Sequence, residues 1–176
     1  MQLNKSYSSL YTAESGSETP LPLAVELEKL KSKACIDQRS VFIAVGHDAC
    51  QMIEVALGIF GKVSPEDAIA VTSHDRFRMI DGCQVLAASH PIPNSEGLNA
   101  AERVSDKLDS CGVGTHVVAL ISDGASALLP SPVAGITLGD KIEVNDLLLN
   151  SKLEIHQVNI VRQSLSTLGS GLITRI

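Results

Sequence analysis

The chain has 176 residues and a formal net charge of −6, with 44% hydrophobic and 19% charged residues. This length fits one domain with a substantial core. The acidic balance and the scarcity of aromatic residues argue against a nucleic-acid partner, because such partners need a basic patch and stacking side chains. The low charged fraction indicates that a second domain or a partner chain covers part of the surface, so a homo-oligomer or a missing second domain is expected.

The sequence contains no apolar run close to the roughly 20 residues that span a bilayer, and its first ten residues lack a signal-peptide core. We therefore expect no membrane partner. The cysteines form no CxxC pair and show no zinc-ligand spacing: Cys35, Cys50, Cys83 and Cys111. No metal site is expected from them, and free thiols are typical of the cytoplasm.

Residues 1–20 are rich in Ser, Thr, Glu and Gly, which predicts a flexible N-terminal arm, and residues 21–176 are predicted to form a single domain. A helix is expected over Leu21–Lys33. Short apolar runs then have the form of buried strands: Ser40–Val45, Ala68–Thr72, Gln84–Ser89 and His116–Ile121.

Apolar residues at spacings of three and four predict helices between these strands. The first follows Ala49 and ends at Gly61. The next covers residues 98–108, with Asn94 or Ser95 as its cap. Pairs with the spacing of a capping box are expected to open two later helices: Thr137 with Asp140, and Ser151 with Glu154.

The last helix is expected to pack His156 among apolar neighbours, to bury a stripe and to end at Gly169–Gly171; the stripe is Val158, Val161, Leu165 and Leu168. Strands that alternate with helices predict an α/β fold of three layers, Rossmann-like, with a mainly parallel sheet and helices on both faces.

Ligands of an open parallel sheet bind beyond the carboxyl ends of its strands. Three segments are expected there: Gly46–Asp48, His90–Pro93 and Ser122–Ser126. In the third, small residues and Gly124 would let backbone amides approach an anion, and a following helix would add the positive end of its dipole. A purely steric use of Gly and Ser at this turn is the alternative, and neither GxxxxGK[ST] nor GxGxxG occurs.

Three other polar residues are candidates with alternatives. His47 could donate a hydrogen bond to a ligand oxygen, or could be an ordinary polar residue at a helix start. His90 could contact a ligand or simply hold its proline-rich loop in place. Arg162 could bind a carboxylate or phosphate with two hydrogen bonds, or could form a salt bridge on an exposed helix face.

Residues Val41 to Leu172 resemble the first domain of the type 2 glycerate kinases, whose members were often labelled hydroxypyruvate reductases. The segments that carry the resemblance keep their order and spacing: Val45–Ala49, Ser89–Asn94, Leu120–Pro130, Ile136–Lys141 and Ile155–Ser166. The resemblance covers about three quarters of this chain but less than half of a full family member.

The resemblance implies ATP-dependent phosphorylation of glycerate, with Mg²⁺, in a cleft between two domains. Gly46 and His90 lie in the matching segments and are candidate binding residues, and His47 is a candidate catalytic residue. The resemblance places Ser122, Asp123, Gly124 and Ser126 in the family's phosphate loop, and Asn159 with a catalytic Arg162 in its NxVR motif.

Several positions depart from the family pattern. His47 stands where the family has Lys, and Asp123 and Ala125 replace two glycines of the loop. Gln163 and Ser164 replace Lys-His after Arg162. Phosphoryl transfer depends on positive charge around the transferred group, so the departures predict a divergent domain without kinase activity of its own.

Three hypotheses follow. The chain is a divergent domain that keeps a small-anion site; or it is a glycerate kinase domain that works with a second domain or partner; or it is a homodimeric interaction protein. All three depend on Gly46 and Ser122 ending two neighbouring central strands, so that their turns meet at one rim of the sheet.

Overall fold

A computed structural model describes residues 10–12, 21–33, 40–61 and 63–168. Its sheet has five parallel strands in the order β1-β5-β2-β3-β4. Their bounds are β1 Leu10–Thr12, β2 Ser40–Val45, β3 Ala68–Ser73, β4 Gln84–Ala88 and β5 His116–Ile121. The four predicted strands are confirmed to within one residue. β2 and β5 are neighbours, as the common rim requires.

The edge strand β1 was not predicted, because it lies inside the segment interpreted as a flexible arm. Leu10 pairs with Ala119 and Thr12 with Ile121, so this part of the arm joins the sheet beside β5. Three residues are too few to show a hydrophobic period. Backbone pairing with a buried neighbour, not a sequence pattern, makes this segment a strand.

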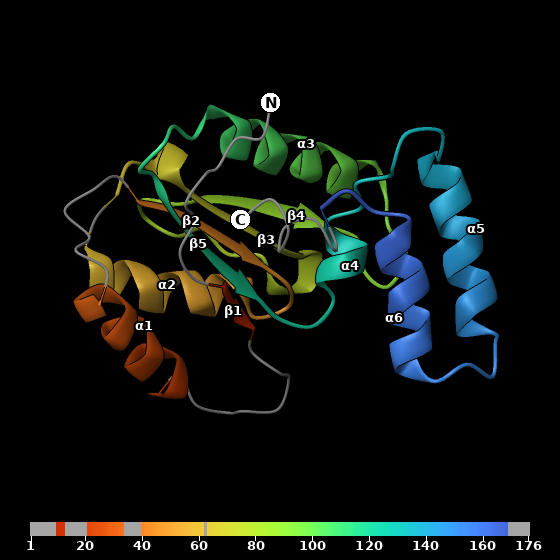
Figure 1. Cartoon of the computed structure of the whole chain (residues 1–176), viewed down its shortest axis with the longest axis horizontal. Coiled ribbons are helices and arrows are strands. Elements are labelled where there is room, and N and C mark those ends of the chain that lie inside the picture. The colour runs from red at the N-terminus through yellow and green to blue at the C-terminus, as the bar shows by residue number, and fades with distance from the viewer. Residues whose placement is uncertain (1–9, 13–20, 34–39, 62, 169–176) are drawn as a thin grey trace.

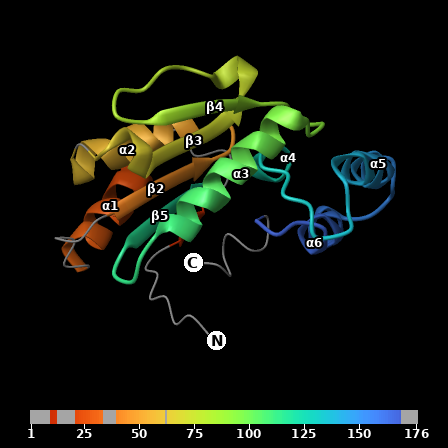
Figure 2. The same cartoon turned by 90° about the horizontal axis from the view of Figure 1, so that it is seen from above.

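Helices cover both faces of the sheet, as expected (Figures 1 and 2). Their bounds are α1 Leu21–Lys33, α2 Ala49–Phe60, α3 Ser95–Ser110, α4 Ala125–Leu128, α5 Leu138–Leu149 and α6 Ile155–Ser164. Alternate residues of β2 face opposite layers, because successive side chains of a strand point to opposite sides. Val41, Ile43 and Val45 pack with α3, whereas Phe42 and Ala44 pack with α1 and α2. The three-layer α/β prediction is confirmed.

Helix ends confirm most of the predicted caps. Gly61 ends α2 with φ +91°, and Asn94 caps α3 by accepting a hydrogen bond of 3.0 Å from the Gly97 amide. Thr137 and Asp140 form the expected capping box. The Ser151–Glu154 box is wrong: Glu154 is itself the cap of α6, paired with Gln157. Ser151 instead donates to the Leu148 carbonyl and closes the preceding helix.

The predicted apolar stripe of the last helix is also wrong in part. α6 ends at Ser164, where the chain enters a turn, so Leu165 and Leu168 lie beyond it. Val158 is buried, but Val161 is only half-buried. His156 is not packed: its side chain is 64% exposed and lies 3.2 Å from Glu154. Gly169–Gly171 lie outside the described residues.

α5 and α6 form an antiparallel hairpin beyond one end of the sheet, with α4 between sheet and hairpin (Figures 1 and 2). Residues 131–133 enter the hairpin and residues 165–167 leave it, and we call these two segments the stem. Pro132 bridges Ser166 in antiparallel pairing, and the Thr167 amide donates to the Ser131 carbonyl at 2.7 Å. The stem therefore fixes one end of the hairpin beside α4. None of the described helices is long and apolar enough to cross a membrane.

Candidate functional site

The turns that follow β2 and β5 are joined directly. The His47 amide donates to the Asp123 carbonyl at 2.9 Å, and the Asp48 amide donates to the Ser122 hydroxyl at 3.0 Å. Gly46 makes this contact possible, since a Cβ there would lie 2.1 Å from Ser122 Oγ. The predicted common rim is therefore present, and Ser122 helps to build it with a buried side chain.

Two imidazoles meet at this rim. The rings of His47 and His90 have centroids 4.4 Å apart and an interplanar angle of 84°, an edge-to-face contact. Gly124 lies against both rings: a Cβ there would be 2.8 Å from His47 Nε2 and 3.2 Å from His90 Cδ2. The structure thus brings together residues that follow three different strands, β2, β4 and β5.

Ser73, the last residue of β3, and Asp75 after it lie next to His47. The Ser73 hydroxyl lies 3.2 Å from His47 Nδ1, and its hydrogen bond to the Asp75 carboxylate lowers the pKa of Asp75. The contact with Ser73 fixes one edge of the His47 imidazole, and Nε2 on the other edge lies beside Gly124.

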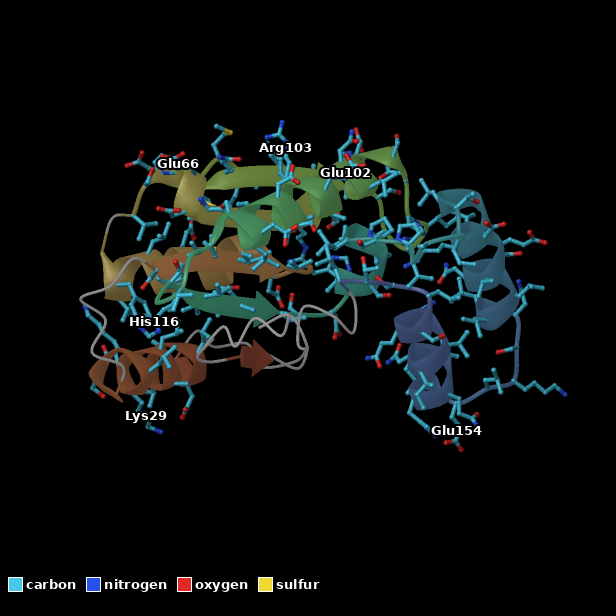
Figure 3. All side chains as sticks on the ribbon, turned by 45° about the horizontal axis from the view of Figure 1, so that its top comes forward. Lys29, Glu66, Glu102, Arg103, His116 and Glu154 are labelled. Atoms are coloured by element: carbon cyan, nitrogen blue, oxygen red, sulfur yellow. The ribbon has the colours of Figure 1, made fainter. Side chains whose placement is uncertain are left out.

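The sequence analysis missed Ser73 and Asp75. A signal was available, since Ser73 ends and Asp75 follows a buried parallel strand, so both belong to the same rim. His116, by contrast, is the first residue of β5, so it lies at the opposite end of the strand from the rim. Figure 3 shows it on the other side of the molecule from Glu154 of the hairpin.

The Ser122–Ser126 loop is arranged differently from a continuous phosphate cradle. Asp123 and Ser126 are exposed, and Gly124 adopts a left-handed conformation with φ +83°. The helix that follows, α4, has four residues, so the dipole contribution expected from it is small. The polar groups that meet at this edge are therefore the two imidazoles, which both lie against Gly124.

Arg162 on α6 belongs to the electrostatic surroundings of the rim. Its charge contributes to lowering the pKa of His90, and its Nε has no hydrogen-bond partner among the described residues. Asn159 lies one turn earlier on α6 with an exposed side chain. The site places Arg162 toward His90, whereas no described contact brings Asn159 to the rim.

The protonation of His90 should make ligand binding depend on pH. Partial desolvation, and then the positive charges of His47 and Arg162, lower the pKa of His90 from its usual value of 6.5. A bound anion would reverse the effect of those charges and raise the pKa. Binding should therefore take up a proton, and affinity should increase by up to about tenfold per pH unit as the pH falls toward the lowered pKa of His90 in the free protein, and level off below it.

Calorimetry with D-glycerate in buffers of different ionisation enthalpy measures this proton uptake. His90→Gln should reduce it, and His156→Gln, which changes an exposed histidine of the hairpin, should not. Without ligand the sign is opposite: a folded-state pKa below the unfolded value means that stability is lost as the pH falls through about 6.5. Affinity that is independent of pH would contradict the assignment of His90.

The fold and the rim define a class: an α/β protein with a parallel sheet whose strand ends carry polar side chains at the switch between β2 and β5, the place where sheets of this kind bind ligands. Residues 12–176 match the family described as a domain of unknown function, DUF4147. The chain belongs to this family. The resemblance to the first domain of glycerate kinases is confirmed by the relatives below.

The glycerate 2-kinase of Pyrococcus horikoshii is 34% identical over 134 residues, which are 76% of this chain and 30% of that protein. The crystal structure of the PH0495 protein of the same organism matches 80% of this chain and 32% of its own, with a TM-score of 0.71 and 32% identity. The glycerate kinase structure from Thermotoga maritima matches 84% of this chain and 39% of its own, with a TM-score of 0.66 and 25% identity. The chain spans about a third of the length of these relatives.

Proposed function

We propose that this glycerate kinase-like domain binds a small carboxylate or phosphate at the rim and does not transfer a phosphoryl group by itself. The observation that carries the proposal is the convergence of His47 and His90 on Gly124, with the charge of Arg162 close enough to affect His90. Imidazoles and a guanidinium supply the donors that a small anion needs.

The described rim does not supply a complete Mg-ATP site. Phosphoryl transfer needs positive charge around the transferred group, and the carboxylate of Asp123 lies in the loop that phosphate oxygens would approach. His47 also stands in place of the lysine expected from the family pattern. These features support anion binding without autonomous catalysis.

The direct experiment is calorimetric titration of the chain with phosphate, D-glycerate and ATP, together with a coupled assay for ADP release from Mg-ATP and D-glycerate. We expect binding of at least one small anion and no turnover above background. Turnover by the chain alone would contradict the catalytic half of the proposal, and a flat response to all three ligands would contradict the binding half.

Restoring positive charge should strengthen the site. His47→Lys with Asp123→Gly adds a cation and removes a carboxylate at the rim, and should raise phosphate affinity by about tenfold or more, because one charge-assisted hydrogen bond is gained and one repulsion is lost. His156→Lys with Glu102→Ala makes the same change in net charge on exposed helices and is the control. Equal gains in both double variants would show a general charge effect and would exclude the rim as the site.

A second candidate function is ATP-dependent phosphorylation of glycerate by this chain together with a second domain or partner. The names of its longer relatives favour it. A third is an interaction protein that forms a homodimer. Exposed apolar side chains of the hairpin support such a partner surface: Leu147, Leu149, Leu153, Ile155 and Ile160. Light scattering at high concentration separates the two, since only the third predicts a dimer of the chain alone.

We propose the cytoplasm as the compartment. Cys50 and Cys83 are free and buried thiols, which supports a reducing environment. Burial raises the pKa of Cys83 to about 12, so that thiol is kept protonated and unreactive.

A further inference from the structure

The inner face of the hairpin carries a lysine where a hydrophobic residue would be expected. The buried residues of α5 are Lys141, Asn145 and Leu148, whose spacing of four and three places them on one face. Lys141 is only 8% exposed. Its ammonium nitrogen is shielded from solvent and has no hydrogen-bond partner among the described residues.

Elsewhere the same fold pairs a buried lysine with a carboxylate. Lys107 and Asp67 have side chains that are 12% and 10% exposed, and their charged atoms lie 2.7 Å apart. Burial of an unpaired ammonium group is strongly unfavourable. Burial also lowers the pKa of Lys141, with no opposing contribution from a nearby carboxylate. The described residues therefore leave this cation without a counter-ion.

The position of Lys141 connects it with the rim. It lies one turn after Thr137, at the end of α5 that joins the stem. Arg162 lies near the end of α6 that joins the stem, and its Nε is likewise buried without a described partner. The charge of Arg162 reaches His90. The stem end of the hairpin thus carries two cations without described counter-ions, and the charge of one of them, Arg162, acts on His90 at the rim.

We propose that Lys141 is a further anion-binding residue, which together with Arg162 holds the small carboxylate or phosphate bound at the rim. This inference rests on the proposed function and extends its site from the strand ends to the hairpin. The bound anion supplies the counter-ion that Lys141 lacks. The site is then formed by two parts of the chain, and removal of one cation weakens binding without loss of the fold.

The first test compares Lys141→Met with Lys152→Met, which removes the same charge from an exposed position of the same hairpin. Phosphate and D-glycerate are titrated separately by calorimetry, which distinguishes a phosphate site from a carboxylate site. Lys141→Met should weaken binding of one of them by about tenfold or more, as expected for loss of a charge-assisted hydrogen bond. Lys152→Met should leave it unchanged.

The thermal stability of ligand-free protein gives a readout that a purely structural lysine would not give. Lys141→Met replaces an unpaired buried charge with an apolar side chain of similar length, so its melting temperature without anion should equal or exceed that of the wild type. The stabilisation that phosphate or D-glycerate gives to the wild type should shrink. A lower melting temperature with unchanged anion stabilisation would overturn the proposal.

The wild-type chain offers a measurement that does not depend on folding of the variant. Carbon NMR of the Lys141 ε position, followed against pH, should show a rise in its pKa of about one unit when the anion binds, because a tenfold coupling corresponds to one unit. An anion that binds without changing this titration overturns the role of Lys141 and leaves the proposed function intact. Failure of every anion to bind overturns both.

Discussion

Gly46→Ala should destabilise the fold by about 3 kcal/mol or more, the largest effect that we expect from one methyl group in this chain. The added Cβ would lie 2.1 Å from Ser122 Oγ and 2.7 Å from the Ser122 carbonyl oxygen. The hydroxyl could rotate away, but the carbonyl belongs to the backbone that joins the two rim turns. The φ of +130° adds strain for any L side chain. Urea unfolding measures the change.

Gly61→Ala is the matched control for Gly46→Ala. Gly61 also has a positive φ, +91°, but a Cβ there would meet nothing within 4 Å. With ψ −178° its backbone conformation is one that essentially only glycine adopts, so the change should cost about 1–3 kcal/mol from backbone strain alone. The difference between the two variants isolates the contact with Ser122. Equal losses would show that the turns after β2 and β5 are not in contact.

Gly124→Ala should remove most anion binding while the fold survives. A Cβ at Gly124 would lie 2.8 Å from His47 Nε2 and 2.9 Å from His47 Cδ2. The imidazole is a side chain and can move, so the loss of stability should be about 1–2 kcal/mol. This movement of the His47 imidazole would displace it from its position at the rim and break its contact with Ser73. Affinity for phosphate or D-glycerate should fall by about tenfold or more.

The control is Gly135→Ala, where φ is +87° and nothing lies within 4 Å of the added Cβ. Gly124 and Gly135 have nearly the same backbone strain, so both variants should lose similar stability from that source. Calorimetric titration should then show weaker binding in Gly124→Ala alone. Unchanged affinity in Gly124→Ala would place the anion away from this turn.

The order of strands and helices could be predicted from the sequence, because the burial of each element determines the spacing of its apolar residues. β2 and β5 are continuous apolar runs, and their bounds were predicted without error, since both faces of a central parallel strand must be covered. The rim followed from them: parallel strands end at the same edge, so Gly46 and Ser122 had to be close if β2 and β5 were neighbours.

Local patterns failed where a neighbour far along the chain decides the conformation. The three residues of β1 form a strand because β5 offers an unpaired edge. Ser151 and Glu154 have the spacing of a capping box, yet Ser151 bonds backward to Leu148. The turn after Ser164 pairs with residues 131–133 through backbone hydrogen bonds and one isolated bridge, and this pairing ends α6 before the apolar stripe does.

The sequence by itself determined the α/β class, the central strands and the turns at which a ligand could bind, because hydrophobic period and glycine position act over a few residues. Only the tertiary structure decided which polar side chains meet there. It placed Ser73 behind His47, His90 against the same ring, and Lys141 inside the hairpin. Hydrogen bonds and the burial of charge depend on distances between remote segments, which no local pattern encodes.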